Sequence, residues 1–349
     1  MRVVVADPPA YTPPYDRFLA AALARAGTEV ELVTSHFRFG EVPAPEGYEV
    51  RDWFYPLSSR MRGARLRLAV KAVEHPLGMA RLALLRPDVL HVQWLVPELD
   101  RWLLRSRAPI VFTAHDIVPR RTKSKIGLWR ALFARVDRVV VHSERGRDGL
   151  LAFGVAEEKL RVIPHPVFRS EASRRDDGRT ALALGLIRPY KGTEDSVEAV
   201  LRVDGARLLV AGDPRVPLEE LRRRAGDRAE WRLGFLPHAE VERALSEATV
   251  GLFPYRDEID LSGALLQTLG AGVPAIVYDI GGLGELVDRF GAGAVVAPGD
   301  VEAMSEALRR LLEDETALAA ARRGAEAARA ELSWDASAVE HLDLYRELL

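Results

Sequence analysis

The chain has 349 residues, a net charge of −2 and 48% hydrophobic residues, which favours a globular protein of two domains. It contains no cysteine, which excludes disulfides and thiolate chemistry. Its apolar runs are shorter than the ~18 residues of a membrane span, and no signal peptide is recognised, so a cytoplasmic location is expected. The charge is uneven: residues 1–170 hold 27 Lys and Arg against 18 Asp and Glu, and the remainder holds 22 against 33. This split predicts different partners for the two halves.

The first half alternates short apolar runs with helical patterns, which predicts a parallel sheet with crossover helices. Strands are expected at 2–7, 29–35, 88–94, 109–116, 137–144 and 160–163, with a first helix at 16–26. Residues 36–58 contain several prolines and are expected to be irregular. The loop after the first strand, PPAYTPPYD, lacks the G-x-G-x-x-G pattern, which argues against a dinucleotide-binding dehydrogenase.

Residues 60–74, RMRGARLRLAVKAVE, fit a helix and carry basic side chains among apolar ones. Two interpretations stay open. The segment is either a solvated helix face or a basic amphipathic helix that lies on an anionic membrane surface. The second interpretation would place the protein peripherally at the inner face of the membrane.

The second half repeats the alternation after residues 168–179, a polar and turn-rich stretch that is the best candidate for a linker. Strands are expected at 181–187, 206–212, 231–236, 250–255, 275–278 and 294–298, and a last helix at 335–349. The expected domains are therefore residues 1–170 and residues 171–333, followed by a C-terminal helix over 334–349.

The stretch 260–285, DLSGALLQTLGAGVPAIVYDIGGLGE, combines two helix starts with one short strand. Ser262 and Gly263 precede an apolar helical pattern, and Gly281 and Gly282 open a turn before Glu285. Helix N-termini carry unpaired N–H groups and about half a positive charge, so the stretch suits a phosphate. An ordinary βα unit with turn glycines would show the same pattern.

Arg188 and Lys191 stand three residues apart in the turn RPYKG, directly after a predicted strand. An arginine fork and a lysine point charge at such a strand end suit a diphosphate, although two solvated surface cations would look alike. Together with the helix start at Ser262, they supply both halves of a diphosphate site.

The order of these motifs resembles the GT-B fold glycosyltransferases, specifically the family-four retaining group (glycosyl transferases group 1). GLIRPYKG at 185–192 is similar to that group's G-x-I-R-x-Y-K-G donor-phosphate motif, and residues 234–255 and 262–287 follow in the family's order. In the first half, TAHD at 113–116, HS at 142–143 and IPH at 163–165 are also similar. The likeness covers nearly the whole chain.

The resemblance implies an α/β fold of two Rossmann-like domains that face a central cleft, with the C-terminal helix crossing back to the N-terminal domain. The C-terminal domain would bind a UDP-sugar or GDP-sugar donor, and the N-terminal domain the acceptor. The expected reaction transfers the sugar, with retention of its anomeric configuration, to a glycan, a lipid-linked or a small-molecule acceptor. No cofactor, metal site or nucleic-acid partner is expected.

The resemblance also assigns roles to individual residues. Arg188 and Lys191 would neutralise the donor diphosphate, and His115 would contact the transferred sugar. The expected donor-binding residues are Gly185, Ser262, Gly263, Gln267, Gly281, Gly282 and Glu285. The expected acceptor or cleft residues are Tyr15, Asp16, His91, Gln93, Asp116 and His165, several of which fall at predicted strand ends where open parallel sheets bind ligands.

One departure from the family concerns the sugar. Most members carry two glutamates in this region, and here the two positions hold Ile259 and Gln267. Gln267 can hydrogen-bond a ribose diol, whereas Ile259 takes no part in polar recognition, and Asp257, Glu258 or Asp260 would have to substitute. Two other functions stay open: a GT-B sugar-nucleotide 2-epimerase, which would need acid and base carboxylates around the sugar and is disfavoured by Ile259, and a catalytically degenerate subunit that only binds a nucleotide-sugar.

Overall fold

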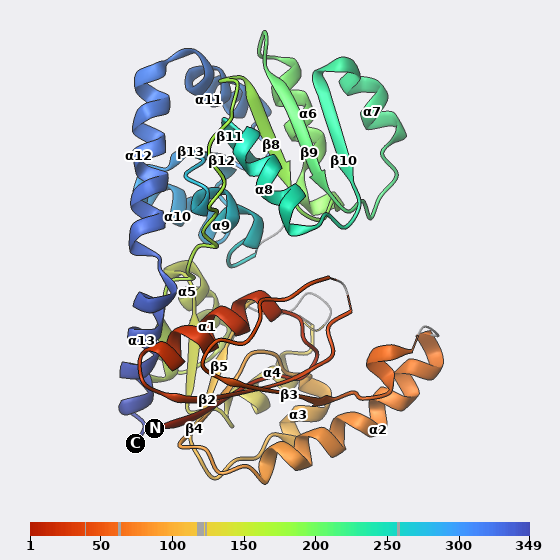
Figure 1. Cartoon of the computed structure of the whole chain (residues 1–349), viewed down its shortest axis with the longest axis vertical. Coiled ribbons are helices and arrows are strands. Elements are labelled where there is room, and N and C mark those ends of the chain that lie inside the picture. Colours follow the sequence, from red (N-terminus) through yellow and green to blue (C-terminus); the bar gives the residue numbers. More distant parts are fainter. Residues whose placement is uncertain (39, 62–63, 117–121, 123, 257–258) are drawn as a thin grey trace. The chain divides into compact units, whose positions relative to one another are not determined.

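A computed structural model describes residues 1–38, 40–61, 64–116, 122, 124–256 and 259–349 of the chain (Figure 1). These residues form two compact units, one made of Met1–Pro164 with Trp334–Leu349 and the other of His165–Ser333. The N-terminal segment of the first unit thus ends at Pro164, a few residues before the domain boundary expected at residue 170. No helix in the described part of the chain is long and apolar enough to cross a membrane.

The first unit contains a seven-stranded sheet in the order β3-β2-β1-β4-β5-β6-β7, and each neighbouring pair is parallel. Its strands are β1 (Arg2–Asp7), β2 (Glu29–Ser35), β3 (Glu49–Phe54), β4 (Val89–Val92), β5 (Ile110–Thr113), β6 (Arg138–Val141) and β7 (Leu160–Val162). Its helices are α1 (Pro13–Arg25), α2 (Ala64–Ala83), α3 (Pro97–Leu103), α4 (Ile126–Phe133), α5 (Glu144–Phe153) and α13 (Trp334–Arg346), with a short 3₁₀ turn η1 (Ser58–Arg60).

Both faces of this sheet are covered, which explains the nearly continuous apolar runs of its central strands. On β1, Val4 and Ala6 belong to a core that includes residues of α2, α4 and α5, whereas Val3 and Val5 belong to a core that includes residues of α1 and α13. The alternation follows from the two-residue period of a strand.

The C-terminal helix is fixed to the first unit by a buried hydrogen bond. Nδ1 of His91, on β4, lies 2.6 Å from Oη of Tyr345, on α13, and Nε2 of His91 lies 2.7 Å from Oγ1 of Thr113. Burial lowers the pKa of His91, so its ring stays neutral and uses one nitrogen as a donor and the other as an acceptor. Residues more than 200 positions apart are thereby joined inside the core.

The second unit contains a six-stranded sheet in the order β10-β9-β8-β11-β12-β13, also parallel throughout. Its strands are β8 (Thr180–Leu184), β9 (Arg207–Gly212), β10 (Ala229–Leu233), β11 (Val250–Phe253), β12 (Ala275–Tyr278) and β13 (Gly293–Val296). Its helices are α6 (Thr193–Leu201), α7 (Glu219–Ala225), α8 (His238–Glu247), α9 (Gly263–Gly270), α10 (Gly282–Phe290), α11 (Val301–Glu313) and α12 (Glu315–Glu331), with a 3₁₀ turn η4 (Pro189–Lys191).

In both sheets the strand order reverses beside the strand that comes first in the sequence of that unit. The reversal lies between β1 and β4 in the first unit and between β8 and β11 in the second. Loops leave such a switch point in opposite directions, which opens a crevice at the carboxyl ends of the strands where ligands bind. The predicted α/β fold of two Rossmann-like domains is confirmed.

Three elements differ from the sequence-based expectations. Residues 36–58 are not wholly irregular, since they contain β3, which pairs only with β2 at the edge of the sheet. The helix expected over 60–74 continues through Pro76 to Ala83, because Met79 and Leu82 bury against the core, and residues 62–63 lie outside the described ones. Helix α12 was not anticipated, although Asp314 caps it through the N–H groups of Thr316 and Ala317.

Replacement of Tyr345 by Phe tests the anchoring of α13. The change leaves Nδ1 of the buried His91 without its partner, so the free energy of unfolding should fall by about 1–3 kcal/mol in chemical denaturation. Tyr11→Phe, at an exposed tyrosine of the same unit, is the control and should leave the unfolding midpoint unchanged. Equal midpoints for both variants and the parent chain would contradict the anchoring role.

Candidate functional site

Three loops of the second unit approach closely at its switch point because glycines allow it. A Cβ at Gly212, the end of β9, would lie 1.8 Å from the carbonyl oxygen of Gly185, which follows β8. A Cβ at Gly192 would lie 2.0 Å from the carbonyl oxygen of Pro254, which follows β11. Gly185 and Gly192 also have φ angles of 102° and 65°, where glycine is favoured. The loop over 185–192 is therefore fixed between the ends of β9 and β11.

Lys191 is connected to the start of α9 through Tyr255. The Lys191 ammonium donates to the Tyr255 hydroxyl and lies 3.8 Å from the centroid of its ring. Tyr255 Oη lies 2.8 Å from Ser262 Oγ. Burial raises the pKa of the Tyr255 phenol, so the hydroxyl keeps its proton and can donate it to Ser262 while accepting from Lys191. Polar groups from three separate segments thus form one hydrogen-bonded chain.

The first turn of α9 is the second component of this site. Ser262 is its N-cap residue, yet its hydroxyl makes no capping bond to α9 among the described residues and is engaged with Tyr255 instead. Gly263 is exposed at the first helical position. The first N–H groups of a helix have no intrahelical acceptor and lie at the positive end of its dipole, so a phosphate fits here.

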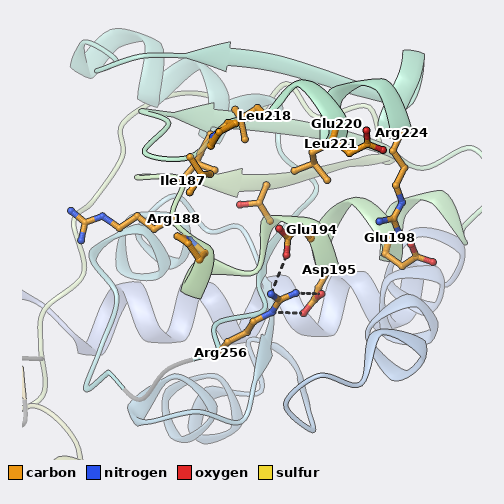
Figure 2. Close-up of a pocket in the computed structure, with 14 residues that line it drawn as sticks. Ile187, Arg188, Glu194, Asp195, Glu198, Leu218, Glu220, Leu221, Arg224 and Arg256 are labelled. Carbon is orange, nitrogen blue, oxygen red and sulfur yellow. Dashed lines mark hydrogen bonds and ion pairs between the residues drawn. The ribbon is translucent and has the colours of Figure 1, made fainter.

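Arg188 is exposed, and within the described residues its guanidinium has no ion pair or hydrogen bond. It lies at the rim of a hollow of about 630 Å³ between α6 and α7. Figure 2 shows its guanidinium directed away from Arg256, which contacts Asp195 at 2.7 Å and Glu194 at 3.0 Å. Of these two arginines, Arg188 is the one available to an anion.

Gly281 and Gly282 bring the start of α10 to the same edge of the sheet. A Cβ at Gly281 would lie 1.6 Å from the carbonyl oxygen of Ile259, and the N–H of Gly282 donates to the carbonyl oxygen of Asp260 at 2.7 Å. Glu285 stands half-buried in the first turn of α10. The turn before α10 is therefore packed on the segment that leads into Ser262.

The two positions that depart from the family pattern have different environments. Ile259 is half-buried and packs on the core that contains residues of α9 and α10, so its side chain serves packing. Asp260 is buried, and Asp257 and Glu258 lie outside the described residues. Gln267 is half-buried on α9, five positions after its N-cap.

In the first unit, His115 follows β5 and is held by its neighbours. Its Nε2 lies 2.9 Å from Oε1 of Gln93, its ring stacks on Trp94 with centroids 5.5 Å apart, and Tyr15 meets it edge-on at 4.7 Å. Gln93 and Tyr15 are buried, whereas His115 is half-buried. Gln93 and Tyr15 therefore support His115, and the rings of His115 and Trp94 are the half-buried parts of this cluster.

Two predicted acceptor or cleft residues are placed differently from expectation. His91 is 0% exposed and bonded on both ring nitrogens, so it is a core residue that cannot reach a ligand. Asp16 is buried on α1 beside Asp7, and burial together with the neighbouring carboxyl raises its pKa well above the ordinary range. The same burial raises the pKa of Asp7 to about 6. His91 is thus hidden by its contacts with Thr113 and Tyr345, and Asp16 by its place beside Asp7.

The remaining two predicted residues differ in exposure: Asp116 is exposed, whereas His165 is buried. Asp116 is exposed directly after His115. His165 is the first residue of the second unit, and its Nδ1 lies 2.7 Å from the carbonyl oxygen of Pro166. Its ring also meets Phe168 edge-on, with centroids 5.7 Å apart.

Sequence reasoning missed three residues that shape these sites. Tyr255 follows β11, and its place at the switch point is the signal that could have identified it. Arg256 donates its backbone N–H to the carbonyl oxygen of Tyr190 at 2.8 Å and fixes the turn that carries Arg188 and Lys191. Trp94 follows directly on Gln93 and covers one face of His115.

Replacement of Tyr255 by Phe tests the hydrogen-bonded chain. The ring remains, but the bonds to Lys191 and Ser262 are lost, so the affinity for UDP or GDP, measured by calorimetry, should fall roughly tenfold. Tyr278→Phe is a matched control. It removes a 3.0 Å hydrogen bond to Asp195, which is not one of the Lys191–Tyr255–Ser262 bonds, and it should lower stability without changing affinity. Equal losses of affinity in both variants would count against a specific role for Tyr255.

The chain matches two family models that together cover most of its length. The model described as Glycosyltransferase Family 4 matches residues 17–170, and the model described as Glycosyl transferases group 1 matches residues 178–314. A relative named glycogen synthase, from Mycobacterium tuberculosis, is 29% identical over 315 residues, which cover 83% of this chain and 73% of the relative.

Solved structures show the same fold. Sucrose-phosphate synthase from Thermosynechococcus elongatus aligns with a TM-score of 0.76 and 22% identity, over 100% of this chain and 99% of that one. HepE from Anabaena, solved in complex with UDP and glucose, aligns with a TM-score of 0.72 and 14% identity, over 100% of both chains. The chain belongs to the group 1 glycosyltransferases of GT-B fold and is a transferase.

Proposed function

We propose that this glycosyltransferase moves a sugar from a nucleoside-diphosphate sugar to a glycan, lipid-linked or small-molecule acceptor, with retention and without a metal ion. The observation that carries the proposal is the grouping at the switch point of the second unit. Lys191 and Ser262 are joined there through Tyr255, and Arg188 is exposed on the same loop as Lys191. Two cations and a helix N-terminus match the two negative phosphates of a nucleoside diphosphate.

The donor class is supported by a structural neighbour. HepE of Anabaena was solved with UDP and glucose, the two parts of such a donor. We propose the same class here, a UDP-sugar or a GDP-sugar, bound by the second unit. Gln267 would hydrogen-bond the ribose hydroxyls, and Gly185, Gly281, Gly282 and Glu285 would line the donor.

Catalysis in this proposal rests on charge. As the bond between the sugar and the diphosphate breaks, negative charge grows on the leaving phosphate, and Arg188, Lys191 and the start of α9 stabilise it. Fixed cations and the helix dipole supply the positive charge that a metal ion would otherwise give. Retention follows if the acceptor attacks from the face that the phosphate leaves, with the phosphate oxygen taking the acceptor proton.

The acceptor is assigned to the first unit. His115, held by Gln93 and Trp94, would contact the transferred sugar there. Residues 1–170 carry 27 basic against 18 acidic side chains, which favours an acceptor with negative charge, such as a lipid-linked or anionic glycan.

Replacement of Arg188 by Ala tests the donor site. Once a thermal-shift screen of nucleotide-sugars has identified the donor, kcat for transfer should fall roughly 100- to 1,000-fold, because an unpaired cation at the diphosphate is lost. Lys191→Ala should act similarly. Arg207→Ala is the control, since Arg207 is exposed at the amino end of β9, on the opposite edge of the sheet. Full turnover by Arg188→Ala and Lys191→Ala would refute the assignment.

The stereochemistry and the metal requirement are tested on the same reaction. The anomeric signal of the new linkage, followed by proton NMR at early times, should have the configuration of the donor, and EDTA should leave the initial rate unchanged. An inverted product or a rate abolished by EDTA would contradict the proposed chemistry.

Isomerisation of UDP-GlcNAc without any acceptor would instead indicate the epimerase, and donor binding without turnover would indicate the degenerate subunit.

A further inference from the structure

Helix α2 carries apolar side chains on two faces. The first unit buries one of these faces only from His75 onward, since Leu68, in line with His75, is 69% exposed. The covered face consists of His75, Gly78, Met79 and Leu82, which are buried. The opposite face consists of Leu66, Val73 and Leu77 with Leu84 just after the helix, and these side chains are 63–80% exposed. Spacings of seven, four and seven residues place them in one line along the helix, here called the α2 stripe. Such a line of exposed large apolar side chains marks an interaction surface.

Basic side chains lie on α2 and within a few residues of its ends. Arg60, Arg65, Arg67 and Arg86 have no ion pair or hydrogen bond within the part of the chain that the structure describes. The one acidic residue of α2, Glu74, is turned toward η1, where it accepts from the N–H groups of Leu57 at 2.8 Å and Ser58 at 3.2 Å. Helix α2 therefore carries four cations against one carboxylate, and that carboxylate is hydrogen-bonded on the side of η1.

The two remaining cations of α2 are placed over aromatic rings. Lys71 Nζ lies 4.3 Å from the centroid of Tyr55, and the Arg81 guanidinium lies 4.4 Å from that of Trp53. Their apolar stems and these rings extend the covered face of the helix, so α2 is held firmly on the unit while its outer side stays uncovered.

We propose that the α2 stripe docks on an anionic lipid surface. Its leucines and valine would enter the boundary between headgroups and acyl chains, and the arginines on and beside α2 would meet lipid phosphates. Charge complementarity favours this occupant. A second copy of the chain would bring two arginine-rich helices together, where like charges repel. The inference does not depend on the donor site, and it would hold the enzyme where a lipid-linked acceptor is found.

Co-sedimentation of the whole chain with vesicles tests the proposal. The chain should bind vesicles of phosphatidylcholine with phosphatidylglycerol at low salt, bind pure phosphatidylcholine more weakly, and dissociate as salt is raised. Arg65→Gln with Arg67→Gln should weaken binding roughly 25-fold, since each basic residue near an anionic surface contributes about fivefold. Val73→Gln with Leu77→Gln should weaken it by about tenfold or more.

Matched controls separate docking from general effects. Val339→Gln removes an exposed apolar side chain from α13, and Arg310→Gln an exposed cation from α11, and both should bind like the parent chain. Circular dichroism and unfolding midpoints should be unchanged in all variants, because every replaced side chain lies at least partly in solvent. Binding that is absent at low salt, or equal in stripe and control variants, would overturn the proposal. A lipid-free dimer that the stripe variants abolish would also overturn it and assign the stripe to a second copy.

Discussion

The hydrogen-bonded chain from Lys191 through Tyr255 to Ser262 is the constraint on which the proposed donor site of the second unit depends. It brings an ammonium group near the positive end of α9, two groups that repel each other when no anion is present. The buried hydroxyl of Tyr255 accepts from the Lys191 ammonium and shares a hydrogen bond with the Ser262 hydroxyl, which holds the two groups at one place. An anion that enters between them finds its donors already oriented, and this preorganisation is what lowers the cost of charge developing in a transition state.

The glycines around this chain have a steric role. Gly192 and Gly212 allow the loop after β8 to touch the loops after β11 and β9, and any side chain there would meet a carbonyl oxygen. The first unit has the same kind of switch point, but the residues around it are of a different kind. At its switch point the neutral, aromatic environment of Trp94 and Tyr15 surrounds His115, and its buried carboxyls have raised pKa values. One strand order thus carries a cationic site in one unit and an aromatic site in the other.

Every strand except β3, the two-domain arrangement and the donor-motif loops could be predicted from sequence because each depends on local patterns. Apolar runs, turn glycines and each single motif are recognised within a few neighbouring residues. Contacts between distant segments were not accessible in this way. His91 looked like an edge residue until its bonds to Thr113 and Tyr345 placed it in the core, and Tyr255 gained its role only through Lys191 and Ser262. The helix expected over 60–74 continues past Pro76, because burial of the following turn outweighs the N–H bond that proline lacks.

A double-mutant cycle on UDP affinity tests the central claim most directly. The variants are Lys191→Met, Ser262→Ala and the pair, each measured by calorimetry on the whole chain. If the two residues bind one diphosphate as a unit joined by Tyr255, the effects will not add, and the coupling energy will be about 0.5–3 kcal/mol. Strictly additive effects, or wild-type affinity in the double variant, would contradict the account.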